Sequence, residues 1–296
     1  MKPPPGRLFF RGNPMWKGMP VLAIASTIIF LTGPAQAGCY SDPTPQIVNA
    51  KMQAGTTFLC NGHYSVLYSS ITHGPLWSAE RLTSENVRLA AGIQRQGQFQ
   101  PDPRLPYDQD ATLEDYRRSG FDRGHMTPSG DEPDRQTQAQ TFYLSNIVPQ
   151  TPALNRGIWA GVEMAVRDLA LQVGELLIVT GPGYDAEIDT IGPDHVFVPA
   201  FTWKAVYLPT KKGGGAYVCA NVNERPACFV ESLAALTVQV GIDPFPQVAA
   251  ASKKQVFPLP KPEHSPYTPD GVVSEDIGEM KEALRDWLRQ WTRPSR

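Results

Sequence analysis

One segment with helical spacing, set between several strand-like segments, constrains the fold of this chain more than any other feature. Residues 155–173 carry apolar side chains on one helix face, among them Ile158, Val162 and Leu169, and this period is typical of an amphipathic helix. Apolar, aromatic and β-branched runs predict strands on both sides of it. These strands cover residues 64–72, 141–147, 176–180, 196–208 and 216–222. The mixture predicts an α+β fold in one domain.

Irregular segments separate and follow these elements. Residues 97–110 are rich in Gln, Pro and Asp and predict a surface loop, and the glycines of residues 211–215 predict a hairpin between the last two strands. Seven prolines make residues 244–269 irregular, and a second amphipathic helix is expected over residues 275–292. We expect that helix to pack on the protein's own core; a membrane or partner role is the alternative.

Residues 1–37 are typical of an export signal. Basic side chains precede an uncharged apolar run at residues 21–31, and an Ala-x-Ala sequence ends at Ala37. The run is shorter than the roughly 20 residues of a transmembrane helix. We therefore expect cleavage after Ala37, one domain over residues 38–296, a secreted or periplasmic location and no stable membrane association after cleavage. A start at Met15, an uncleaved anchor and a lipid anchor on the next cysteine are alternatives.

The charge of the chain argues against a protein that is basic throughout. The 27 Lys and Arg residues oppose 29 Asp and Glu residues, for a net charge of −2. The export signal holds four of the basic residues and none of the acidic ones, so the net charge of the mature chain is −6. A nucleic-acid substrate must therefore bind a local basic groove on an acidic body.

The cysteines form an even set, which predicts disulfides in an exported chain. They are Cys39, Cys60, Cys219 and Cys228. Of the three possible pairings we favour Cys39–Cys60 and Cys219–Cys228, because each closes a short loop. A zinc site is the competing interpretation, and the lack of any C-x-x-C spacing argues against it.

A short region of the chain contains the groups that phosphodiester hydrolysis requires. Arg123 and His125 flank one glycine, and Asn146, Asn155 and Glu163 follow downstream. A neutral imidazole can take a proton from water, while arginine and Mg²⁺ stabilise charge on the phosphoryl oxygens. The set lacks the several histidines or carboxylates of a tightly held transition metal, whereas a few oxygen ligands suit hydrated Mg²⁺.

Three motifs here resemble those of a known family. They are Asp122-Arg123-Gly124-His125, Ser145-Asn146-x-x-Pro149-Gln150 and Leu154-Asn155-x-Gly157-x-Trp159-x-x-x-Glu163. In this order they look like the DNA/RNA non-specific endonucleases, which include secreted bacterial nucleases and mitochondrial endonuclease G. Val179-Thr180-Gly181-Pro182 and Val198-Pro199-x-x-x-x-Lys204 extend the resemblance. It implies the ββα-metal nuclease fold, with a mostly antiparallel central sheet flanked by helices.

The resemblance also implies roles for individual residues. His125 is expected to be the general base, Arg123 to lie near the phosphate and Asn146 to lie beside the catalytic groups. Asn155 is expected to be the one direct protein ligand of Mg²⁺, for which Mn²⁺ can substitute. Asp122 is expected to brace the strand rather than bind the metal. A plain N-cap is the alternative role of Asn155, because asparagine favours that position.

Three further residues complete the expected site. Glu163 lies eight residues after Asn155, about 12 Å along a regular helix. It is therefore expected to orient waters around the metal rather than to share its coordination. Arg167 is expected near the phosphate, although an ordinary ion pair with Glu163 at i,i+4 is an alternative. Arg95 is a further candidate for phosphate binding, with looser spacing relative to the family.

Together these features predict an exported Mg²⁺-dependent endonuclease that cuts DNA and RNA with little sequence specificity. A degenerate nucleic-acid-binding protein of the same fold and a phosphodiesterase for small esters are the alternatives. A homodimer and an immunity or inhibitor protein are further partners that the sequence leaves open.

Overall fold

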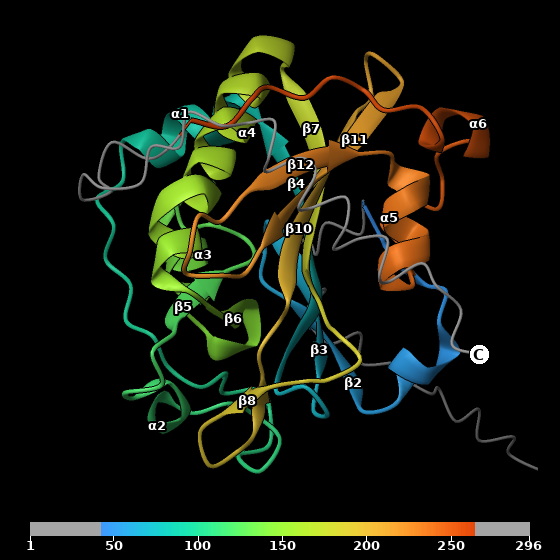
Figure 1. The fold of residues 1–296 in the computed structure, drawn as a ribbon. Helices are drawn as coiled ribbons and strands as arrows, with labels where there is room; N and C mark the ends of the chain where they lie inside the picture. The colour runs from blue at the N-terminus through green and yellow to red at the C-terminus, as the bar shows by residue number, and fades with distance from the viewer. Residues whose placement is uncertain (1–42, 264–296) are drawn as a thin grey trace, which may run out of the picture. The chain divides into compact units, whose positions relative to one another are not determined.

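A seven-stranded antiparallel sheet forms the centre of the computed structural model, which describes residues 43–263 (Figure 1). Its spatial order is β12-β11-β10-β7-β4-β3-β2. The strands are β2 (Thr56–Cys60), β3 (Tyr64–Ser69), β4 (Gly74–Thr83), β7 (Glu175–Gly183), β10 (Phe201–Leu208), β11 (Gly213–Ala220) and β12 (Cys228–Glu231). The predicted α+β class is confirmed. The expected export signal and C-terminal helix lie outside the described residues.

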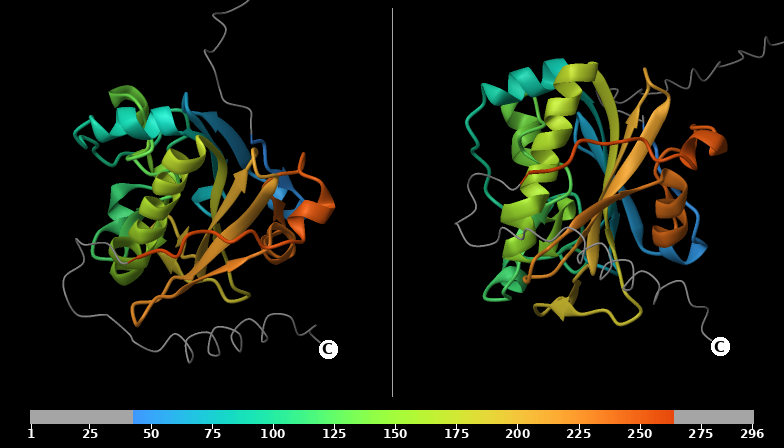
Figure 2. Two further views of the ribbon diagram at one scale, coloured as in Figure 1. Left: turned by 90° about the horizontal axis from the view of Figure 1, so that it is seen from above. Right: turned by 45° about the horizontal axis from the view of Figure 1, so that its top comes forward.

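Helices cover both faces of this sheet (Figures 1 and 2). Helices α1 (Ser84–Ala91) and α4 (Ala160–Val173) lie on one face, and α5 (Leu233–Val240) lies on the other. The remaining elements are short: β1 (Gln46–Ile47), η1 (Ala50–Gln53), α2 (Leu113–Tyr116), α3 (Arg135–Gln140), η2 (Leu144–Asn146), β8 (Thr190–Ile191), β9 (Val196–Phe197), β13 (Ile242–Asp243) and α6 (Ala250–Lys253).

Strand β7 shows why the sheet is buried on both faces. Leu176 and Ile178 belong to the core beneath α4, whereas Leu177 and Val179 belong to the core beneath α5. Successive strand residues point to opposite faces, so a continuous apolar run supplies both cores. The predicted strand at residues 176–180 is therefore confirmed, and it extends further than the prediction.

The hairpin β5 (Asp122–His125) and β6 (Ile147–Gln150) lies apart from the central sheet and is followed by the helix. This strand–strand–helix unit is the ββα arrangement that the resemblance implied. The predicted strand over residues 141–147 is wrong, because the strand begins only at Ile147. Phe142 and Leu144 are buried apolar residues in a turn and a 3-10 helix, and burial alone imitated a strand pattern.

The predicted helix over residues 155–173 is present but not continuous. Its first part, η3 (Leu154–Trp159), precedes α4 and contains a kinked turn between two helical stretches. Gly157 departs from helical geometry, with φ −98° and ψ −109°.

The hairpin predicted around residues 211–215 is confirmed, since Leu208 pairs with Gly213 at its end. The strand expected from residue 196 begins only at Phe201, because Val196–Phe197 forms β9 and pairs with β8 instead.

A disulfide joins two neighbouring strands near the end of the described chain. Cys219 of β11 and Cys228 of β12 are directly opposite in register and are bonded, as predicted. Cys39 lies outside the described residues, so the Cys39–Cys60 pair stays a prediction.

The described part of the proline-rich segment, residues 244–263, is irregular apart from the short helix α6. It crosses the sheet edge, where the Tyr217 hydroxyl donates to the Pro260 carbonyl at 2.6 Å. Between residues 43 and 263 there is no helix with the length and apolarity needed to cross a membrane.

Candidate active site

Strand β5 carries His125, and the adjacent Gly124 lets the side chain of Gln150, on the paired strand β6, approach closely. Gly124 pairs with Val148 across the hairpin. A Cβ at position 124 would lie 2.2 Å from the Gln150 Oε1 atom, so no larger residue fits without displacing Gln150. Gln150 is fully buried and donates to Thr202 Oγ1 at 3.3 Å, which ties the hairpin to strand β10.

Aromatic rings enclose the His125 imidazole. Its ring centre lies 5.3 Å from that of Phe99 and 4.9 Å from that of Phe142. Its Nε2 atom is buried and has no hydrogen-bond partner in the described part of the chain. Burial, together with the positive charge of Arg95, lowers the pKa of His125 from 6.5 to about 3. The imidazole is therefore neutral at physiological pH and can accept a proton.

The side chain of Asn146 makes its hydrogen bonds within the protein. It is fully buried, and its amide nitrogen donates to the carbonyls of Thr127 (2.9 Å) and Thr141 (3.0 Å). Its amide oxygen accepts from the Thr127 backbone N–H at 3.0 Å, and its own carbonyl accepts from the Met126 N–H. Both amide hydrogens are used internally, so Asn146 fixes the chain that follows His125, and its place among the catalytic residues stays a prediction.

Asn155 and Asp122 form an oriented pair. The Asn155 Nδ2 atom donates to Asp122 Oδ2 at 3.0 Å, and the Arg156 guanidinium donates to both carboxylate oxygens at 2.6 and 2.7 Å. Burial of Asp122 opposes its ionisation, but the hydrogen bonds from Arg156 and Asn155 lower its pKa below the usual value. With the Nδ2 atom held, the orientation of the amide oxygen of Asn155 is fixed as well.

Asn155 is not an N-cap in this structure. Ala153 occupies the N-cap position of η3, and Trp159 occupies that of α4. The N-cap alternative for Asn155 is therefore wrong, and the predicted brace role of Asp122 extends from the strand to the asparagine side chain.

Glu163 and Arg167 face the same region from helix α4. Burial raises the pKa of the half-buried Glu163 carboxyl to about 7, although Arg167 and Lys204 oppose this shift. Arg167 pairs with Asp131 at 2.9 Å rather than with Glu163. The alternative of a plain surface ion pair between Glu163 and Arg167 is thus not what the structure contains.

One cavity of about 460 Å³, the His125 pocket, brings most of these side chains together. Six of the seven predicted site residues line it: Arg95, Arg123, His125, Asn155, Glu163 and Arg167. On a regular helix Asn155 and Glu163 would point about 80° apart. The kinked turn at Gly157 lies between them, and both side chains line the pocket.

Sequence reasoning missed the residues that hold these groups in place. Phe99 lies beneath the Arg123 guanidinium at 4.5 Å, and Phe142 beneath that of Arg95 at 5.2 Å. Gln138 accepts a hydrogen bond from the backbone of Gln96, which fixes the segment that carries Arg95. These contacts join residues far apart in sequence, so no local sequence pattern could predict them.

Lys204, which the sequence named only as part of the resemblance and gave no role, also lies near the site. It is 1% exposed and donates to Thr180 Oγ1 at 2.7 Å and to the Met126 carbonyl at 3.3 Å. Burial raises the pKa of the neighbouring Glu80, and Lys204 opposes that shift. A lysine in the middle of an apolar strand is rare unless it is paired, and this was visible in the sequence.

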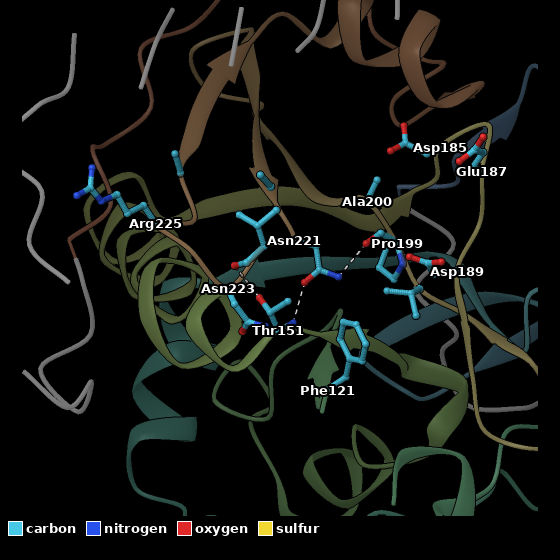
Figure 3. A pocket seen from close by; sticks show the side chains of 14 residues that line it. Phe121, Thr151, Asp185, Glu187, Asp189, Pro199, Ala200, Asn221, Asn223 and Arg225 are labelled. Atoms are coloured by element: carbon cyan, nitrogen blue, oxygen red, sulfur yellow. Dashed lines mark hydrogen bonds between the residues drawn. The ribbon is translucent and has the colours of Figure 1, made fainter. Parts of the chain in front are cut away.

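A second cavity of about 550 Å³ lies elsewhere and has the opposite charge (Figure 3). Asp185, Glu187 and Asp189 lie on one side of it, and Arg225 lies apart from them. Asn221 at its base uses its amide to bind Thr151 and Pro199. An acidic wall repels a polyanion, so the His125 pocket is the better candidate for nucleic acid.

Comparison with known proteins agrees with this geometry. Residues 44–251 match the family model of the DNA/RNA non-specific endonucleases. The mitochondrial nuclease EXOG of Danio rerio is 35% identical over 189 residues, which cover 58% of this chain and 54% of that protein. Human mitochondrial endonuclease G is 34% identical over 161 residues, covering 51% and 54%. The chain thus spans about half the length of these curated relatives.

A solved structure also shares the fold. In a crystal structure of the EndoG/EndoGI complex, one chain superimposes with a TM-score of 0.59 at 27% identity, covering 64% of this chain and 87% of that one. Because the family model matches more than half of the sequence and the ββα unit is present, this chain belongs to the DNA/RNA non-specific endonuclease family.

Proposed function

We propose that this protein is an exported, Mg²⁺-dependent endonuclease that hydrolyses phosphodiester bonds in DNA and RNA with little sequence preference. The observation that carries the proposal is the His125 pocket. There a neutral imidazole, an oriented amide, a carboxylate and four arginines line one cavity of the size of a small ligand site.

The donor set of this pocket fits a hydrated magnesium ion. Asn155 offers an amide oxygen whose orientation is fixed by the bond from its Nδ2 to Asp122, and Glu163 offers a carboxylate in the same pocket. Hard oxygen donors in small number suit Mg²⁺, which retains most of its water ligands. Asn155 would hold the ion directly and Glu163 through water. When bound, Mg²⁺ would neutralise charge that develops on the phosphoryl oxygens.

His125 would act as the general base. Its imidazole is neutral because it is buried between aromatic rings, so a lone pair is available to take the proton of the attacking water. A base is most effective when its pKa lies near the working pH. A bound phosphodiester anion offsets the Arg95 cation, and we expect it to raise the pKa of His125 toward that range.

Arginines would bind the phosphate. Arg95 and Arg123 stack on aromatic rings and are exposed to solvent. Arg167 is held by an ion pair with Asp131. Contacts to phosphate carry no sequence information, which supports cutting of many sequences and of both nucleic acids. In-line attack by water would leave a 5′-phosphate, as in the family.

Export is supported by the features of the leader and by the disulfide. An Ala-x-Ala site ends at Ala37, and the Cys219–Cys228 bond fits an oxidising compartment. A protein inhibitor is a further partner that we propose, since the related structure is titled as an EndoG/EndoGI complex with a mechanism of EndoG inhibition.

The test is digestion of plasmid DNA and of RNA by the purified mature chain, with Mg²⁺ or with EDTA. His125→Ala should lower turnover by about 10²–10⁴-fold, and Asn155→Ala should remove the EDTA-sensitive activity. His195→Ala is the matched control, because this exposed histidine lies between β8 and β9. Binding of nucleic acid without Mg²⁺-dependent cutting would refute the proposal.

A further inference from the structure

A third cavity, distinct from the acidic one of Figure 3, lies beside the His125 pocket and shares three residues with it. This Arg118 pocket has a volume of about 570 Å³. The shared residues are Arg95, Arg123 and Asn155. Helix α2 and the turn that leads into β5 supply its other wall, including Arg117 and Arg118. The two cavities are therefore neighbours, and the path considered below runs from the His125 pocket past their shared residues into the Arg118 pocket.

The charges along this path are unequally balanced. Two of its carboxylates already have cationic partners: Glu114 pairs with Arg117 at 3.0 Å, and Asp122 pairs with Arg156. Arg118 is exposed and forms no ion pair with any residue in the described range 43–263. It thus adds an uncompensated positive charge beyond the His125 pocket, on a mature chain that is acidic as a whole.

The turn that presents Arg118 is held in place by its own hydrogen bonds. The Ser119 hydroxyl donates to the Tyr116 carbonyl at 3.0 Å and accepts from the Phe121 N–H at 3.1 Å. Arg118 itself has a φ of 59°, in the left-handed region that is uncommon for residues other than glycine. Its backbone is therefore fixed next to the shared wall of the two cavities.

We propose that the Arg118 pocket binds the phosphate next to the scissile one on the same nucleic-acid strand, and that Arg118 is the residue that contacts it. The inference rests on the proposed function for the position of the scissile phosphate at His125. Leu113, which is 42% exposed, and the ring of Phe99 line the same cavity and give apolar surface for the adjoining sugar or base.

The chain offers a closely matched control for this residue. Arg225 is also an exposed arginine with a left-handed φ, 48°, but it lines the acidic cavity of Figure 3. Arg118→Ala and Arg225→Ala therefore remove the same charge from the same kind of backbone position, and only the first lies on the proposed strand path.

The first measurement is binding of a fluorescent 12-nucleotide single strand in EDTA, where no cutting is expected, at several NaCl concentrations. Each phosphate contact on a single strand contributes about 0.7 to the slope of log K against log salt. Arg118→Ala should bind several-fold more weakly and lower this slope by about 0.7, and Arg118→Lys should restore most of it. Arg225→Ala should match the wild type.

The second measurement is cleavage with Mg²⁺. The KM of the 12-nucleotide substrate should rise in Arg118→Ala, because a contact made equally in ground and transition states affects binding and not turnover. The ratio of wild-type to variant kcat/KM should be larger for this strand than for a dinucleoside monophosphate, which carries only the scissile phosphate.

The outcomes separate the two proposals. If the wild type cuts nucleic acid but Arg118→Ala and Arg225→Ala have equal affinity and salt slope, the inference is overturned and the proposed function stands. If the wild type binds the strand without cutting it and Arg118→Ala alone lowers the salt slope, Arg118 is a phosphate contact of a binding protein; the proposed function then fails, and with it the assignment of this contact to the phosphate next to the scissile one. Equal losses at short and long substrates would also overturn the inference.

Discussion

Replacing His125 by asparagine should change how the stability of the protein depends on pH. The native imidazole has a pKa lowered to about 3 because it is buried and lies near Arg95. In the unfolded chain a histidine titrates near pH 6.5. Below that pH the unfolded state binds a proton that the native state does not, so the free energy of unfolding falls as the pH drops toward 3 and is unaffected above about 7.

The magnitude follows from these two pKa values. Between pH 7 and pH 5 the wild type should lose about 2 kcal/mol of unfolding free energy through this residue alone. Glu163 acts in the opposite direction, since its raised pKa makes the native state bind protons below pH 7. Both chains contain Glu163, so subtracting the pH dependence of the variant from that of the wild type isolates the histidine.

Urea unfolding of the oxidised, metal-free chain at pH 7 and pH 5, followed by tryptophan fluorescence, measures the effect. The loss of unfolding free energy between these pH values should be about 2 kcal/mol larger in the wild type than in His125→Asn. His195→Asn, at an exposed position, is the control and should follow the wild type. Parallel losses in the wild type and His125→Asn would refute the argument that burial keeps this imidazole neutral.

Three other changes test parts of the structure that support the site. Asp122→Ala releases the amide of Asn155 and should raise the Mg²⁺ concentration for half-maximal cutting by about 10–100-fold; an unchanged titration would contradict this role. Gly97→Ala places a Cβ 1.8 Å from the Phe142 ring and should cost about 1–3 kcal/mol in thermal unfolding, so a wild-type Tm would count against the packing described. Alanine at both cysteines of the β11–β12 disulfide, whose sequence separation is 9, should lower the free energy of unfolding by about 2–3 kcal/mol; an unchanged urea midpoint would argue against it.

Six of the seven side chains predicted from the sequence line one cavity, but the sequence did not show how they are held. The motif around His125 was recognisable because its residues are close in sequence. Asn146 belongs to the same set of motifs, yet its amide is consumed by Thr127 and Thr141. Only coordinates reveal how a buried amide uses its hydrogens, so the sequence could not show that Asn146 also positions the chain beside His125.

Errors in secondary structure have a similar physical origin. Phe142 was assigned to a strand because it is apolar and favours β structure. In the structure it lies in a turn, and its ring packs against His125. The helical spacing of residues 160–173 was interpreted correctly, but periodicity cannot reveal the kinked turn at Gly157 that precedes them. That turn depends on Gly157 and on the tertiary packing of its neighbours, including the buried Trp159.

The kinked turn at Gly157, within Leu154–Trp159, also limits how the length of this segment can vary. Deleting or inserting a single residue there would rotate everything beyond it by about 100° around the helix axis. The Glu163 carboxylate would then turn away from Asn155, although every side chain of the site would still be encoded. In this stretch, evolution can exchange amino acids far more freely than it can add or remove them.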